Sequence, residues 1–127
     1  NPKANIHLYI DNHPNILFVA KTSNLYHLAS FSEESVNPNC IGDGRGMIIS
    51  LTNRRFYQLH ANKKSLKYDK LYLIFGNSEI RVSGGEKKVF SNFGINNSHF
   101  DAMGDRVDAL LGEGNSKEAE LDCFEVH

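Results

Sequence analysis

The chain has no tryptophan, two cysteines and three prolines among its 127 residues, and no long hydrophobic run. Cys40 and Cys123 belong to no Cys-x-x-Cys pair, so neither a zinc knuckle nor a disulfide scaffold is indicated, and two reduced thiols are expected. No apolar stretch approaches the roughly 20 residues that a membrane helix needs, and the first residues have no signal-peptide character. We therefore expect a soluble, cytoplasmic protein without membrane insertion. The missing initial Met indicates a processed product or an excised domain.

The charges nearly cancel. The 14 Lys and Arg against 15 Asp and Glu give a formal net charge of -1, so no overall field concentrates the protein on nucleic acid or on anionic lipid. Hydrophobic residues make up 40% and charged residues 23%, which is a globular composition. With one composition throughout and no internal repeat, residues 1–127 are expected to form a single domain.

Alternating apolar and polar residues dominate the chain, as in strands that place one face on a core. The expected strands cover residues 6–10, 16–20, 25–31, 47–51, 56–60, 71–75, 79–82, 88–90 and 121–126, with a helical turn or two over 106–111. The polar segments 32–45 and 61–70 are expected to be long loops. This pattern predicts a mainly β fold, a two-sheet antiparallel β-sandwich with short helical turns, and an α+β fold is the alternative.

The most apolar strands should supply the core. The residues expected to be buried together are Ile16, Phe18, Met47, Ile49, Leu71, Leu73, Phe75 and Phe124. Gly76 follows the apolar run that ends at Phe75 and precedes the turn formers Asn77 and Ser78. Because the chain must reverse sharply there, a positive φ is expected at Gly76.

Five strings, taken in order, resemble the TLDc domain. Gly46–Asn53, which reads Gly-Met-Ile-Ile-Ser-Leu-Thr-Asn, is similar to the family's Gly-Phe-Leu-Phe-Ser-Leu-like strand. Phe75–Val82 resembles its aromatic-Gly stretch, and Ser91–Gly94 resembles its Asn-aromatic-Gly turn. Leu110–Gly112 and Phe124–Val126 are similar to the Leu-Ala-Gly and Glu-Val-Tyr segments that end the domain.

The resemblance covers Ile16 to Val126 and implies a divergent TLDc domain from a single-celled eukaryote, shortened at its N-terminus. Leu28–Phe31 stands where many members have a Gly-Gly-Tyr-Thr-like turn, and the helical segment that usually precedes the first hairpin is missing. The family implies a non-catalytic interaction module, linked to the oxidative-stress response or to regulation of the vacuolar ATPase. The expected partner is therefore a protein, such as a large assembly of that kind.

The sequence contains no strong motif for a phosphate-binding, metal-binding or catalytic site. The glycines of Gly42–Gly46 lack the Gly-Lys-Ser/Thr ending of a phosphate loop and precede a strand, and the six histidines show no metal-binding spacing. No Gly-x-Ser-x-Gly string occurs. We therefore expect no catalytic residues, no metal and no cofactor. A small hydrolase stays open as an alternative, because catalytic triads assemble from distant residues.

Basic clusters lie beside aromatic residues at Arg54–Tyr57, Lys63–Tyr68 and Lys87–Phe90. This combination suits a β-sandwich that binds a glycan or single-stranded nucleic acid, which is the first alternative function. The near-zero net charge argues against nucleic acid, and lysines near edge strands commonly prevent edge pairing.

The alternation of side chains along the strands also predicts which residues face outward. If Ile80 and Val82 are buried, Glu79 and Arg81 face outward, and if Phe124 and Val126 are buried, Glu125 does too. We expect Glu79, Arg81 and Glu125 to bind the partner through charge-assisted hydrogen bonds. The loop candidates for partner binding are Asp43, Arg45 and Asn97.

Overall fold

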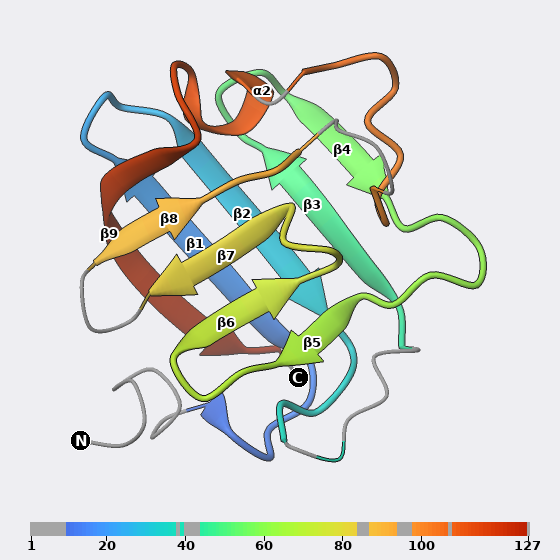
Figure 1. Ribbon diagram of the computed structural model, residues 1–127. Coiled ribbons are helices and arrows are strands. Elements are labelled where there is room, and N and C mark those ends of the chain that lie inside the picture. The colour runs from blue at the N-terminus through green and yellow to red at the C-terminus, as the bar shows by residue number, and fades with distance from the viewer. Residues whose placement is uncertain are drawn as a thin grey trace.

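The computed structural model describes residues 10–37, 39, 44–83, 87–93, 98–106 and 108–126, and it is mainly β (Figure 1). The elements, in chain order, are β1 (Ile16–Thr22), β2 (His27–Ser32), β3 (Gly46–Ser50), β4 (Arg55–Gln58), β5 (Leu66–Tyr68), β6 (Tyr72–Phe75), β7 (Ile80–Ser83), β8 (Lys88–Phe90), α2 (Asp108–Leu111) and β9 (Ser116–Glu125). The expected strand over 6–10 lies outside the described residues except for Ile10. Among the described residues, no helix has the length and apolar character needed to cross a membrane.

The strands form one antiparallel sheet in the order β4-β3-β2-β1-β9-β8-β7-β6-β5. The prediction of a mainly β, antiparallel fold is confirmed, but the strands make a continuous sheet in place of two separate ones. The reason is the length of β9, which has ten residues and begins earlier than the expected 121–126. Residues 119–125 of β9 pair with β1, and residues 116–118 pair with β8.

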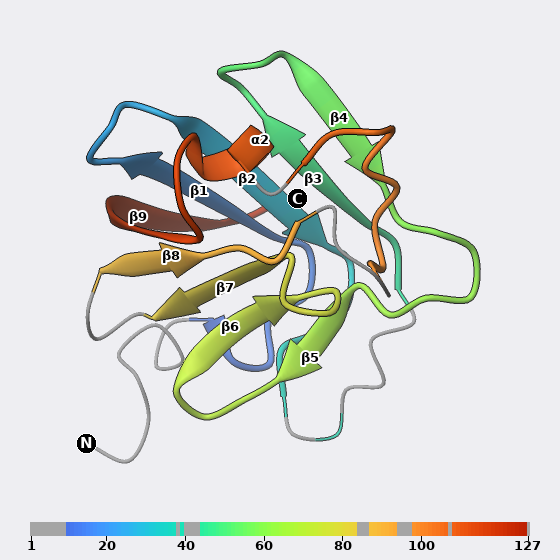
Figure 2. The same cartoon turned by 45° about the horizontal axis from the view of Figure 1, so that its top comes forward.

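The sheet folds over so that β5–β8 lie in front of β1–β4 (Figure 1). The core fills the space between these halves, where the rings of Phe18 from β1 and Phe75 from β6 lie 6.2 Å apart. α2 lies at one end of β1–β3 (Figure 2) and contributes Leu110 and Leu111, both fully buried.

Two hairpin turns hold α2 in place. The Asn24 side chain, between β1 and β2, donates to the Leu111 carbonyl at 2.8 Å, and the Asn53 side chain, between β3 and β4, donates to the Ala109 carbonyl at 2.7 Å. These carbonyls lie in the last turn of the helix, where no intrahelical donor is available. Gly112 ends the helix with a φ of 80°, the left-handed conformation that favours glycine after a helix.

The predicted core is half right. Ile16, Phe18, Leu73 and Phe75 are buried. Met47 and Ile49 are partly exposed, while Leu71 and Phe124 are 55% and 51% exposed. The expectation for these four residues was wrong: β3 buries Ile48, β9 turns Cys123 inward, and Leu71 precedes β6. Apolar runs do not reveal by themselves which alternate set faces inward.

The expected turn at Gly76 is confirmed. Gly76 joins β6 to β7 with a φ of 63°, and its amide donates to the Ser65 carbonyl at 2.9 Å. A Cβ atom at this position would lie 2.7 Å from the Glu79 carboxylate and 2.7 Å from the Phe100 ring. Glycine is therefore required both by the backbone conformation and by the space. The short strand β5 falls in the segment 61–70 that was expected to be a loop.

Replacing Leu73 by Ala tests the core. Leu73 is 1% exposed, so its loss should leave a cavity and lower the free energy of unfolding by about 2–5 kcal/mol. The matched control is Leu71→Ala, two residues away and largely exposed, which should change stability by less than about 0.5 kcal/mol. Urea unfolding measures both variants, and equal losses would contradict the inward direction assigned to Leu73.

Candidate interaction surface

Glu79 is buried, which corrects the expectation that it faces a partner. Its side chain is 1% exposed and follows the β6–β7 turn. One carboxylate oxygen accepts from the amides of His99 and Phe100 at 2.6 and 2.7 Å and from the Ser98 hydroxyl at 3.0 Å. The other oxygen accepts from the Asn77 amide. Glu79 therefore ties the 98–100 segment to the turn, and both of its oxygens are occupied.

Arg81 faces outward, as expected, between buried Ile80 and Val82. Its guanidinium lies 4.7 Å from the centre of the Tyr72 ring and 4.6 Å from that of the Phe90 ring. These cation–π contacts fix the side chain against the outer face of β6–β8. Its Nε atom is buried and has no hydrogen-bond partner.

Glu125 is exposed, as expected, although it shares the core-side alternation of β9, and the assumed burial of Phe124 and Val126 was wrong. Ala119, Leu121 and Cys123 of β9 belong to or pack against the core, and Glu125 shares their alternation at the margin of the sheet. Its carboxylate contacts Nδ1 of His13. The three residues expected to bind a partner are therefore not brought together on one surface.

The loop candidates have different outcomes. Asp43 and Asn97 lie outside the described residues. The Arg45 side chain is 91% exposed and forms an ion pair with Glu33 at 3.4 Å. Such exposed pairs contribute little to stability, so the Arg45 guanidinium remains accessible to solvent at the start of β3.

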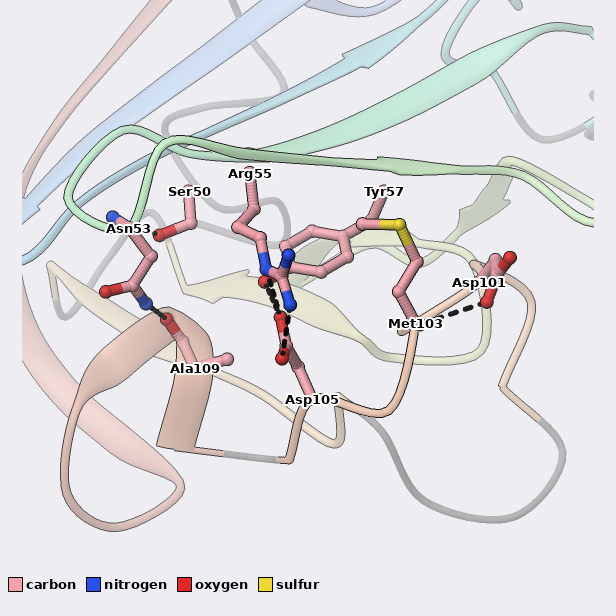
Figure 3. Close-up of polar contacts among 8 residues, drawn as sticks. All are labelled: Ser50, Asn53, Arg55, Tyr57, Asp101, Met103, Asp105 and Ala109. Carbon is pink, nitrogen blue, oxygen red and sulfur yellow. Dashed lines mark hydrogen bonds and ion pairs between the residues drawn. The ribbon is translucent and has the colours of Figure 1, made fainter.

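A polar cluster anchors the edge strand β4 (Figure 3). Arg55 and Tyr57 both point toward Asp105: the Arg55 guanidinium donates to both carboxylate oxygens, at 2.9 and 3.1 Å, and the Tyr57 hydroxyl donates at 2.6 Å. The hydrogen bonds from Arg55 and Tyr57 lower the pKa of Asp105, and the bond from Arg55 has the larger effect. Asp105 in turn raises the pKa of Arg55. Burial, followed by the bond to Asp105, raises the pKa of Tyr57. The cluster fastens residues after Phe100 to β4.

Cys123 is a half-buried free thiol in β9. Burial raises its pKa to about 12, so the thiol stays protonated at neutral pH and is a poor nucleophile. This agrees with the interpretation of Cys123 as a small core side chain. Within the described part of the chain, no group of three or more His, Cys, Asp or Glu residues is arranged to hold a metal ion.

The face of β1–β4 that points away from the core carries a second apolar set. The register aligns two rows across β9, β1, β2, β3 and β4: Phe124, Leu17, Phe31, Met47 and Gln58 in the first, and Asp122, Val19, Ala29, Ile49 and Phe56 in the second. The eight apolar members of these rows are named the outer apolar band: Leu17, Val19, Ala29, Phe31, Met47, Ile49, Phe56 and Phe124. Ala29 is buried between its larger neighbours, and the five members other than Ala29, Phe56 and Phe124 are half-buried. Phe56 and Phe124, at opposite ends, are 58% and 51% exposed.

Sequence reasoning missed this surface. The runs 16–20 and 47–51 are apolar on both faces, which fits a strand that is covered on both sides. One face of each run does pack on the core, but the other belongs to the outer apolar band. The signal was present in the sequence as apolar residues at both alternations, although it was interpreted as burial.

No protein-family model matches the chain, and no curated protein matches it at a significant level.

Glu79→Gln should lower the free energy of unfolding by about 2–4 kcal/mol, because charge-assisted bonds to buried amides are lost and an amide group meets backbone donors. Glu113→Gln, at an exposed position after α2, is the control and should change stability by less than about 0.5 kcal/mol. Thermal or urea unfolding gives both values. If Glu79→Gln were as stable as the control, the anchoring role of this carboxylate would be refuted.

Asp105→Asn should destabilise the fold at neutral pH and much less in acid. Folding lowers the pKa of Asp105, so its contribution is present above the unfolded value of about 3.9 and disappears as pH falls through the lower folded value. The stability difference from the parent, measured by urea unfolding as a function of pH, should therefore shrink below about pH 4. A difference that stays constant down to the lowest pH tested would argue against the ion pair.

Proposed function

We propose that the chain is a non-catalytic protein-interaction module of TLDc type whose partner covers the outer apolar band. The observation that carries this proposal is the pair of apolar rows on the outer face of β1–β4 and β9. An antiparallel sheet that faces water on one side ordinarily carries polar residues on that side. Here eight of the ten positions in two neighbouring rows are apolar. Contiguous exposed patches of this kind mark interaction sites.

The reactive side chains support a binding role over catalysis. Both oxygens of Glu79 accept from backbone and hydroxyl groups, both oxygens of Asp105 are held by Arg55 and Tyr57, and the Cys123 thiol has a raised pKa. Each group is therefore occupied by the fold or lacks the ionised form needed for nucleophilic attack. The small hydrolase that the sequence left open receives no support from these three groups.

A ligand-binding domain for glycan or single-stranded nucleic acid finds less support than the interaction module. Base or sugar stacking needs free aromatic faces. The guanidinium of Arg81 covers one face of Tyr72 and of Phe90, so of the aromatic residues beside the basic clusters Phe56 is the one with a largely exposed ring. A hollow lined by Arg45, Lys63 and Lys64 is basic, but the described residues that line it include no Phe or Tyr on which a base or sugar could stack.

The family resemblance supplies the biological setting of the proposal. TLDc domains act as interaction modules, and a link to the oxidative-stress response or to a large assembly such as the vacuolar ATPase follows from that resemblance. We also propose a cytoplasmic location, which the free thiol of Cys123 would suit, since such compartments are reducing.

The test compares proteins captured from the source cell by three tagged chains. The first is the parent, the second is the double variant Phe56→Ser, Phe124→Ser, and the third is the control Leu25→Ser, Leu71→Ser, whose residues are 65% and 55% exposed outside the outer apolar band. Because two large apolar contacts are lost, the first double variant should retain partners about tenfold less well than the parent. The control should match the parent.

Matching melting temperatures establish that the variants are folded before capture is compared. Equal recovery of the same proteins by all three chains would refute the outer apolar band as the interaction surface, and so would equal losses in both double variants.

A further inference from the structure

The outer apolar band is long and narrow. It crosses five strands spaced about 4.8 Å apart, so it is about 19 Å long, and its two rows lie about 7 Å apart, which gives a width of about 12 Å with side chains included. Polar residues make up most of the neighbouring row on each long side. Apolar Leu51 and Val126, which are 51% and 43% exposed, continue these rows just after β3 and β9. The neighbouring cross-strand row on one side contains Glu120, Lys21 and His27. Asn15, Glu33 and Arg45 continue the register on the other side through backbone hydrogen bonds.

These dimensions distinguish the possible occupants. The apolar footprint is on the order of 250 Å², whereas a stable face-to-face dimer buries about 800 Å² on each partner. A second copy of this chain would therefore have to bury the charged rows as well. A single α-helix has a diameter of about 10–12 Å, and 19 Å corresponds to about 13 residues of helix. The band thus has the width of one helix and the length of about three and a half helical turns.

We infer that the occupant is one amphipathic α-helix of a partner protein, lying across the strands with its apolar stripe on the outer apolar band. This inference rests on the proposed function and names the class of partner for the same surface. Helices that bind in this way present apolar residues at positions i, i+3, i+4 and i+7 to the receiving surface. Phe56 and Phe124, at the two ends of the band, would contact the first and last turns of the helix.

The charges of β9 indicate which charged residues the bound helix should carry. β9 directs Glu118, Glu120 and Asp122 to the same side as Phe124, because alternate residues of a strand share one face. Lys88 and Lys21 lie opposite Glu118 and Glu120 in register, but the cross-strand neighbour of Asp122 is Val19. Asp122 therefore places a carboxylate within the second row of the surface without a cation opposite it. The bound helix should carry Lys or Arg where its apolar stripe meets β9.

Three synthetic peptides of 14 residues test the inference by NMR titration of the isotope-labelled chain. The first has Leu at helical i, i+3, i+4, i+7 and i+11 positions and two Lys at one end of the stripe. The second has the same composition without helical periodicity, and the third has Glu in place of Lys. We expect the first peptide to shift signals of the outer apolar band and to bind about tenfold more tightly than the second.

The third peptide tests whether the surface prefers a helix with basic residues at one end. The Glu peptide should bind about fivefold more weakly than the Lys peptide at low salt, and the difference should shrink as salt rises. In the double variant Glu120→Lys, Asp122→Lys the preference should reverse. Equal binding of the Lys and Glu peptides, or a preference that the variant does not change, would overturn the basic edge of the helix.

Equal affinity for the periodic and non-periodic peptides would overturn the helix, and so would signal shifts confined to β5–β8. Analytical ultracentrifugation tests whether a second copy of the chain is the occupant. A parent protein that sediments as a dimer, together with a Phe56→Ser, Phe124→Ser variant that sediments as a monomer, would also overturn the helix. The capture experiment separates this failure from that of the proposed function. Capture that depends on Phe56 and Phe124, combined with no peptide preference, keeps the interaction surface and rejects only the helix.

Discussion

The pairing of β9 with both β1 and β8 is the contact on which the rest of the architecture depends. This ten-residue strand joins β1–β4 to β5–β8 in one sheet, and its alternation determines which side chains point between the halves. Ala119, Leu121 and Cys123 point toward the core, so Asp122 and Phe124 must point away from it. The same register, carried through β1, β2, β3 and β4, buries one apolar set in the core and leaves the partly exposed outer apolar band on the opposite face of the sheet.

The strands themselves could be predicted from the sequence, because alternation and turn residues are local signals. Gly76 is an example, since the short connection between two apolar strands required a positive φ there. The inward face of each strand could not be predicted with the same success. Met47 to Leu51 is apolar at both alternations, so only its pairing with β2 shows that Ile48 faces the core. In β9, Phe124 is larger and more apolar than Cys123, yet the register turns Cys123 inward.

The polar anchors depend on contacts between residues far apart in the chain, which composition and spacing do not reveal. Glu79 binds the amides of His99 and Phe100, and Asp105 binds Arg55 and Tyr57. Glu79 fastens residues 98–100 to the β6–β7 turn, and Asp105 is fastened to β4. Their charge therefore stabilises the fold, while the partner-binding role that we propose lies on the apolar outer face. In the interaction that we propose, apolar burial would supply affinity and the charges of β9 would supply orientation.

Hydroxyl-radical footprinting of the chain alone and bound to a captured partner tests the role of the outer apolar band most directly. Oxidation of Phe31, Met47, Phe56 and Phe124 should fall in the complex, because the partner covers their side chains. Leu25, Leu71 and Met103 are exposed outside the outer apolar band and should be oxidised equally in both states. Protection of those three residues, with unchanged oxidation of Phe56 and Phe124, would contradict the proposed interaction surface.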